Sequence, residues 1–387
     1  MDVKKFFTNK SFCVLPWTGF ELEPNGDVKN CIIYKEVLGN INDTDIQDIM
    51  SNAQNLKLKK DMNADSKPYN CSGCHLQELH RKDPSSISSR RYYNRELGKD
   101  YLNISKEFSL HHVDLRWTNH CNQACVYCSP LYSSKWATEL NEKVRSKKSA
   151  RDKLKEYVFD NVKQLRNVYL AGGEPMLMNE NKEFLKLLLK QNPDVTIRVN
   201  TNLSSTNTGV FELLCQFKNV HWTVSVESIE KEYEYIRHHG SWKDFLQNLK
   251  CIQKLNHKIS FNMLYFILNY KSIFNTVDYF KDLGFVDNSF IIGPLYKPSH
   301  LNILNLPENM LDEIKERLEA EIPKSMGYLK NSYENILTYI KETTFENNIT
   351  KFLLQTYERD MRRGVNATKI FPKLFEELDA YPLDKFN

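Results

Sequence analysis

The sequence predicts an α/β protein whose core is an open, partial (β/α)6 TIM-like barrel. Three observations support this fold class. From about residue 110, short β-rich runs alternate with amphipathic helical stretches, as in βαβ units around a parallel sheet. Residues 1–105 are instead rich in turns and hold four of the nine cysteines, and the pattern beyond residue 300 is helical. We therefore expect a small cysteine-rich α+β domain (1–105), the barrel (106–298) and a helical carboxyl-terminal extension (299–387).

The six barrel strands are expected where β-branched and aromatic residues concentrate, each run being followed by a helical pattern. The runs are 111–117, 167–172, 195–201, 220–226, 259–267 and 288–295. Six units are fewer than the eight of a complete barrel, so the barrel should remain open. In such folds the loops at the carboxyl ends of the strands carry the chemistry.

Both flanking regions contain a local signal. Asn25-Gly26 stands between alternating residues and predicts a β-hairpin in the amino-terminal domain. Pro307 can open a helix at its first turn, and the residues that follow it continue a helical pattern. The segment 235–239, Tyr-Ile-Arg-His-His, follows the fourth barrel strand, and we interpret it as a polar loop.

Composition narrows the class of protein. The 387 residues are 41% hydrophobic and carry a net charge of +4, which gives no support to a nucleic-acid partner. No apolar run is long enough to cross a membrane and no secretory signal is recognisable, so we expect a cytoplasmic protein. Clustered cysteines in a reducing compartment predict metal binding rather than disulfides.

The most specific motif follows the first barrel strand directly. Cys121, Cys125 and Cys128 have the spacing C-x3-C-x2-C. Three thiolates on one short loop can ligate three irons of a cubane cluster. The missing fourth cysteine leaves one iron open for another ligand, as a catalytic metal site keeps an open position.

This loop resembles the signature of radical S-adenosylmethionine (SAM) enzymes, with Tyr127 at the aromatic position before the last cysteine. A second element agrees, because Gly172-Gly173-Glu174-Pro175 follows the second strand and resembles the GGEP motif of that family. The resemblance implies a [4Fe–4S] cluster on the three cysteines, with SAM chelated at the open iron. It also implies that the GGEP stretch holds the SAM amino group, with glycines that let the backbone approach a ligand.

Further SAM contacts follow from the same resemblance. Ser225 and Glu227, at the end of the fourth strand, resemble a polar pair that binds the SAM ribose, although the family usually has aspartate at the second position. Asn200 and Asn202 end the third strand and are candidate SAM or substrate contacts.

A second cysteine set, Cys13, Cys31, Cys71 and Cys74, has the spacing C-x17-C-x39-C-x2-C. Four thiolates suit either a closed zinc site or a fully ligated iron–sulfur cluster. The segment resembles the Twitch or SPASM auxiliary-cluster domains of radical SAM enzymes, here preceding the barrel. This resemblance favours a second, auxiliary [4Fe–4S] cluster over zinc.

We therefore expect a radical SAM enzyme that forms a 5′-deoxyadenosyl radical and abstracts a substrate hydrogen. The auxiliary domain makes a peptide or protein side chain the first candidate substrate, and a sugar, nucleotide or amino acid the alternative. A flavodoxin- or ferredoxin-type protein would be the reductant. An alternative of another class is a metal-binding or electron-transfer module without SAM chemistry, which the GGEP stretch disfavours.

Overall fold

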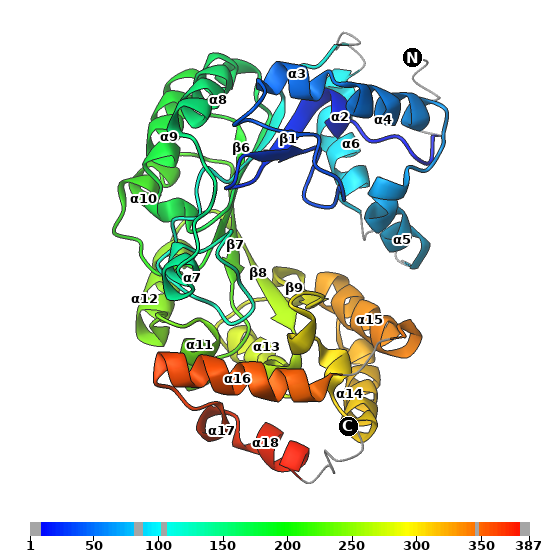
Figure 1. Ribbon diagram of the computed structural model, residues 1–387, viewed down its shortest axis with the longest axis vertical. Coiled ribbons are helices and arrows are strands. Elements are labelled where there is room, and N and C mark those ends of the chain that lie inside the picture. The colour runs from blue at the N-terminus through cyan, green and yellow to red at the C-terminus, as the bar shows by residue number, and fades with distance from the viewer. Residues whose placement is uncertain (1–8, 81–87, 102–106, 345–347, 380–387) are drawn as a thin grey trace.

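The computed structural model describes residues 9–80, 88–101, 107–344 and 348–379 (Figure 1). The expected domain boundary near residue 105 lies outside the described residues. Within them, nine strands form one sheet in the order β3-β2-β1-β4-β5-β6-β7-β8-β9. The strands are β1 (Gly19–Leu22), β2 (Asp27–Lys29), β3 (Gly39–Asn40), β4 (His112–Leu115), β5 (Asn167–Leu170), β6 (Thr196–Thr201), β7 (Val220–Ser225), β8 (Lys258–Tyr265) and β9 (Phe290–Pro294).

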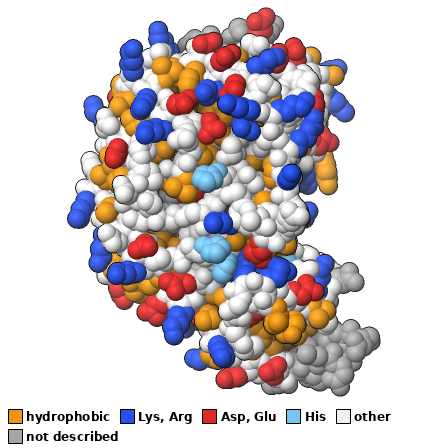
Figure 2. Space-filling view, turned by 60° about the vertical axis from the view of Figure 1, so that its left-hand side comes forward, with side chains coloured by type: hydrophobic (Ala, Val, Ile, Leu, Met, Phe, Trp, Pro, Cys, Tyr) orange, Lys and Arg blue, Asp and Glu red, His pale blue; other side chains and the backbone are white. Residues whose placement is uncertain are grey.

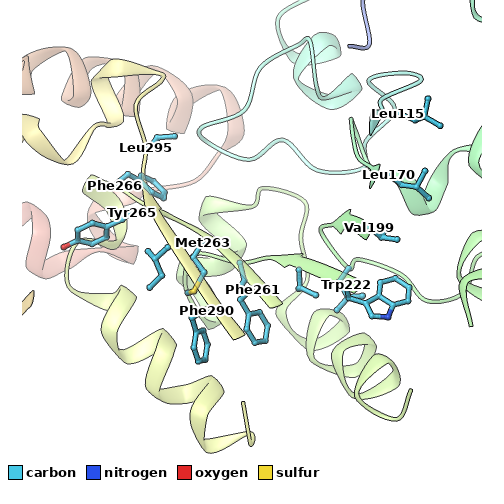
Figure 3. Packing of buried hydrophobic residues seen from close by; sticks show 14 of the residues in the cluster. Leu115, Leu170, Val199, Trp222, Phe261, Met263, Tyr265, Phe266, Phe290 and Leu295 are labelled. Carbon is cyan, nitrogen blue, oxygen red and sulfur yellow. The ribbon is translucent and has the colours of Figure 1, made fainter. Parts of the chain in front are cut away.

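The six predicted barrel strands are confirmed as β4 to β9, and each pairs in parallel with the next. Their side chains alternate between two faces. One face is apolar: Leu115, Leu170, Val199 and Trp222 stand in register on neighbouring strands, with Phe261 and Phe290 beyond them (Figure 3). The other face carries polar residues, in register as Asp114, Tyr169, Arg198 and His221.

The helices that follow these strands cover the apolar face. In Figure 1, α8, α9, α10 and α12 lie together on one side of the sheet. Helix α9, for example, buries Phe184, Leu185 and Leu188. The helices are α2 (Leu15–Thr18), α3 (Ile46–Met50), α4 (Ala53–Asn63), α5 (Ser72–His80), α6 (Ser89–Tyr101), α7 (Ser134–Glu139), α8 (Lys148–Asp160), α9 (Asn179–Gln191), α10 (Gly209–Leu214), α11 (Glu230–Ile236), α12 (Trp242–Gln253), α13 (Ser272–Asp282), α14 (Glu308–Glu321), α15 (Gly327–Glu342), α16 (Ile349–Arg363), α17 (Ala367–Ile370) and α18 (Pro372–Asp379).

The amino-terminal region extends the barrel sheet. The predicted hairpin is confirmed, since β1 and β2 pair antiparallel and Gly26 has the positive φ of +91° that its turn requires. Strand β1 then pairs in parallel with β4. The sequence did not indicate this shared sheet, because strand pairing between distant segments leaves no local pattern.

The carboxyl-terminal helices pack at the opposite end of the sheet (Figure 1). Helix α14 begins directly after Pro307, close to the predicted start. Helix α15 packs on the edge strand β9, where Ser332 Oγ accepts a hydrogen bond from the Ile292 N–H. Helix α16 reaches back toward α7, where Arg363 forms an ion pair with Glu139.

The surface carries charges of both signs. On the face shown in Figure 2, acidic and basic side chains are interspersed rather than gathered by sign, in keeping with the small net charge. Among the described helices, none is both long and apolar enough to cross a membrane.

Candidate functional site

Cys121, Cys125 and Cys128 lie on one loop, which joins β4 to α7. The first turn of α7 holds this loop in shape. Ser134 Oγ donates to the Cys121 carbonyl oxygen at 3.0 Å, and Trp136 Nε1 donates to the Cys125 carbonyl oxygen at 2.7 Å. The carbonyl groups of two of the three cysteine residues are therefore fixed by side chains of the following helix.

Cys121 and Cys125 are buried, Cys128 is half-buried, and the three thiols interact with one another. Burial raises the pKa of each thiol, that of Cys128 to about 12. Repulsion from Cys125 adds to the raised pKa of Cys121 and of Cys128, and Cys128 in turn raises the pKa of Cys121. Three thiols that interact in every pair lie close enough together to bind one cluster, which binds each sulfur as the thiolate.

The glycines after β5 pack against this cysteine loop. Gly172 has a φ of +109°. A Cβ atom at Gly173 would lie 2.1 Å from the carbonyl oxygen of His120, which leaves no room for any side chain. Gly173 thus lets the chain pass directly against its own cysteine loop. Pro175 then begins a short 3-10 helix (Pro175–Leu177).

Glu174 joins the ends of β5 and β6 beneath the loop. Its carboxylate accepts hydrogen bonds from Thr201 Oγ1 and from the Asn202 N–H, both at 2.7 Å. Burial raises its pKa to about 7. The Asn202 side chain turns toward the loop, where Nδ2 donates to Asn122 Oδ1 at 3.0 Å and to Cys121 Sγ at 3.9 Å. The structure therefore brings Glu174 and Asn202 to the cysteine loop.

Asn200 and Ser225 lie on the polar face of the sheet near the carboxyl ends of their strands. Asn200 stands opposite Thr223, two residues before Ser225. The Asn200 Oδ1 atom is buried and has no hydrogen-bond partner within the described parts of the chain. An unpaired buried acceptor at this position fits a ligand that would donate a hydrogen bond to it.

Glu227 follows the carboxyl end of β7, the position that the sequence predicts. Its carboxylate is engaged by Arg237, with Nε to Oε2 and Nη2 to Oε1 both at 2.8 Å. Tyr127 Oη also donates to Glu227 Oε1 at 3.0 Å. Arg237 belongs to the segment 235–239 that we interpreted as a polar loop, yet its side chain is only 3% exposed. The only available signal was that this segment follows a barrel strand.

The four amino-terminal cysteines come from separate segments that fold together. Cys13 precedes α2, Cys31 follows β2, Cys71 ends the 3-10 helix Tyr69–Cys71, and Cys74 lies in the first turn of α5. Burial raises the pKa of Cys13, Cys31 and Cys71, the last to about 12, and repulsion between the thiols adds to each shift. These interactions link every pair among the four thiols.

Polar groups beside these cysteines are buried without partners. Asn30 Nδ2 and Oδ1, Ser72 Oγ and His75 Nε2 make no hydrogen bonds to the residues that the structure describes. Three unpaired side chains next to three of the cysteines suit a bound group that accepts or donates hydrogen bonds. Nearby, Arg90 forms a partly buried ion pair with Glu78 at 2.5 Å.

In the described ranges, no group of three or more His, Cys, Asp or Glu side chains is arranged as the ligands of one metal ion. An iron–sulfur cluster requires a different arrangement, since its cysteines bind different irons.

Comparison with protein families decides the family. Residues 115–293, which contain the cysteine loop, match the model of the radical SAM superfamily. The barrel of this chain belongs to the radical SAM superfamily. Residues 13–75 match the SPASM model, described as an iron–sulfur cluster-binding domain, and this span holds all four amino-terminal cysteines. The prediction of an auxiliary-cluster domain before the barrel is confirmed. The two families imply a [4Fe–4S] cluster with SAM in the barrel and auxiliary iron–sulfur in the SPASM domain.

Individual relatives are distant. A GTP 3′,8-cyclase of Campylobacter lari is 20% identical over 245 residues, which are 61% of this chain and 70% of that enzyme. A GTP 3′,8-cyclase of Nautilia profundicola is 27% identical over 96 residues, which are 25% of this chain and 29% of the relative.

Similar solved structures include two with bound peptides. SuiB of Streptococcus suis, bound to its precursor peptide SuiA, has a TM-score of 0.41 and 16% identity, covering 73% of this chain and 64% of SuiB. The anSMEcpe structure with AdoMet and the Cp18Cys peptide has a TM-score of 0.38 and 13% identity, covering 53% and 58% of the two chains. The chain thus spans less than two thirds of either solved structure, and less than a third of the Nautilia relative.

Proposed function

We propose that this enzyme cleaves SAM reductively and abstracts a hydrogen atom from a peptide or protein side chain. The observation that carries the proposal is the single loop after β4 that holds Cys121, Cys125 and Cys128, fixed by α7 and joined by Asn202 from the end of β6. When bound there, a [4Fe–4S] cluster supplies the electron that splits SAM into methionine and a 5′-deoxyadenosyl radical.

The chain's own residues would hold the cofactors. Cys121, Cys125 and Cys128 would hold three irons of the cluster and leave the fourth open to SAM. The remaining SAM contacts come from the carboxyl ends of β5, β6 and β7 and from the cysteine loop itself. They are Tyr127, Gly172, Gly173, Glu174, Pro175, Asn200, Asn202 and Ser225. Glu227 stays in this set, because its Oε2 accepts one hydrogen bond from Arg237 and keeps a second lone pair for a ribose hydroxyl.

Glu174 would act by orientation. Its carboxylate fixes the Asn202 backbone, and the Asn202 amide is then directed at Cys121. Because Gly173 lets the chain pass against His120, the GGEP stretch and the cysteine loop form one packed unit. This packing would keep the SAM-binding groups at a fixed distance from the open iron.

Cys13, Cys31, Cys71 and Cys74 would hold an auxiliary [4Fe–4S] cluster that accepts an electron from the substrate radical or anchors the substrate. The unpaired Asn30, Ser72 and His75 groups support a bound cluster, since hydrogen bonds to its sulfurs tune iron–sulfur sites. Zinc at these four thiolates is the alternative.

A peptide or protein side chain is the favoured substrate class because of the SPASM domain. A small molecule is the second candidate, supported by the two relatives named GTP 3′,8-cyclase. Mass spectrometry of candidate peptides and of GTP, each incubated with SAM and reductant, separates the two.

The decisive experiment measures iron, sulfide and 5′-deoxyadenosine on protein reconstituted without oxygen. We expect about eight irons per chain, falling to about four in a Cys121/Cys125/Cys128 triple alanine variant. The wild type should form 5′-deoxyadenosine with SAM and dithionite, and the variant should form none. A wild type that carries its full iron but forms no 5′-deoxyadenosine would contradict the proposal. About four irons together with zinc would contradict only the auxiliary cluster.

A further inference from the structure

Arg237 lies directly opposite Cys125 because two backbone segments pair there. The Val126 N–H donates to the Ile236 carbonyl oxygen at 2.8 Å, and the Ala124 N–H donates to the His238 carbonyl oxygen at 2.9 Å. These two bonds flank the Cys125–Arg237 position on both sides. These two backbone hydrogen bonds fix which residues of the two segments stand opposite each other. The backbone of Arg237 is therefore held beside Cys125 by the fold.

The guanidinium group of Arg237 uses three of its nitrogen atoms. Nε and Nη2 bind the Glu227 carboxylate side by side, and Nη2 also donates to Tyr127 Oη at 2.7 Å. The remaining nitrogen, Nη1, donates to Cys125 Sγ at 3.8 Å. Tyr127 Oη closes the network by donating to Glu227.

The Arg237–Glu227 ion pair is almost completely buried. The side chains of Arg237 and Glu227 are 3% and 2% exposed. A buried ion pair is retained at a desolvation cost that good geometry must offset. Glu227 stands where the family usually has aspartate, and here it anchors Arg237. Three donors that serve a carboxylate, a phenol and a sulfur at once require the planar fork of arginine, which lysine lacks.

We propose that Arg237 is a positioning residue that donates a hydrogen bond to the Cys125 sulfur and places its positive charge beside it. Glu227 and Tyr127 hold the Arg237 side chain in this position. The inference rests on the proposed function only in taking Cys125 as a cluster ligand. Hydrogen bonds to ligand sulfurs and nearby charge set the reduction potential of an iron–sulfur cluster. A donor beside Cys125 stabilises the more negative, reduced cluster, so it raises the potential and eases electron entry from a flavodoxin- or ferredoxin-type donor.

The test is an EPR-monitored redox titration of the full-length, reconstituted enzyme in the absence of SAM. The cluster is identified as the signal lost in the Cys121/Cys125/Cys128 triple alanine variant. For R237Q we expect reduction to become about tenfold less favourable, a midpoint about 59 mV more negative for one electron. R237K keeps the charge but loses the third donor, so its midpoint should shift in the same direction by less.

Arg359→Gln is the matched control. Arg359 is also buried, and its Nη2 donates to Tyr235 Oη and Thr356 Oγ1 rather than to a thiol. Its variant should keep the wild-type midpoint. R237Q with wild-type iron content and an unchanged midpoint would overturn the proposal. If R237Q fails to take up iron, R237K decides alone, and an unchanged midpoint there overturns it as well. Because no SAM is present, a wild type that cannot cleave SAM would refute the proposed function without affecting this result.

Discussion

The two cysteine sites of this enzyme are built in opposite ways. Cys121, Cys125 and Cys128 lie within residues 121–128 of a single loop, and neighbouring elements hold that loop rigidly. The amino-terminal site collects Cys13, Cys31, Cys71 and Cys74 from segments that stand far apart in the sequence. The first site is largely shaped by local chain geometry, whereas the second exists only after distant segments have folded together.

Both sites place an arginine–glutamate pair beside the thiols, fully buried at the barrel site and partly buried at the amino-terminal site, but with different contacts. Arg237, paired with Glu227, donates to the Cys125 sulfur. Arg90, paired with Glu78, donates to the carbonyl oxygen of Phe12 at 2.8 Å, next to Cys13 in the chain. The barrel site therefore has a side chain aimed at a sulfur, and the amino-terminal site has one that fixes the backbone leading to a cysteine.

The largest expected difference concerns metal-linked stability. A bound metal group that cross-links the chain stabilises the fold more when it closes a longer loop. Closing the loop from residue 13 to residue 74 should add about 4 kcal/mol to the free energy of unfolding, and closing the loop from 121 to 128 about 2 kcal/mol. We expect a C71A/C74A variant to lose more unfolding free energy than the Cys121/Cys125/Cys128 variant, while still forming 5′-deoxyadenosine. Anaerobic urea denaturation measures the first effect and chromatography of the nucleoside the second. Equal losses of stability would break the comparison.

A glycine at each site offers a matched test of rigidity. G173A should lower the free energy of unfolding by about 3 kcal/mol, because its Cβ would meet the His120 backbone at 2.1 Å and backbone cannot turn aside. G73A, between Cys71 and Cys74, should cost less than about 1 kcal/mol. Its Cβ would meet only the Ile33 side-chain carbon Cγ2, at 2.5 Å, and alanine favours the helix. Urea denaturation of both variants measures the two losses of unfolding free energy. A larger loss in G73A than in G173A would refute the view that the barrel cysteine loop is the more tightly packed of the two.

A further prediction concerns the link between the two regions. Tyr132 lies in the cysteine loop, four residues after Cys128. Its Oη donates to Glu23 Oε1, in the turn between β1 and β2, at 2.9 Å. Y132F should cost about 1–2 kcal/mol of unfolding free energy, as expected for a hydrogen bond to a charged acceptor. The iron content should stay at the wild-type value. A loss of auxiliary iron in this variant would mean that the link shapes the amino-terminal site.

The barrel was predictable because its signals are local. Each of the six strands was confirmed from its own composition, and the hairpin at Asn25-Gly26 from its turn residues. The position of Asn202 beside the cysteine loop followed from its place at the end of a strand. Glu227 and Arg237 were not predictable in the same way. Whether a carboxylate faces a ligand or a buried arginine depends on which distant segment packs beside it.

Sequence alone determined the family, the strand order along the barrel and the cysteines that serve as candidate ligands, because spacing and alternation are written in consecutive residues. Only the tertiary structure decided that β1 joins the barrel sheet, that Gly173 is needed for the His120 backbone, and that Arg237 is directed at Cys125. Each of these depends on contact between segments distant in the chain. The free energy of such contacts comes from burial and register, which no local pattern records.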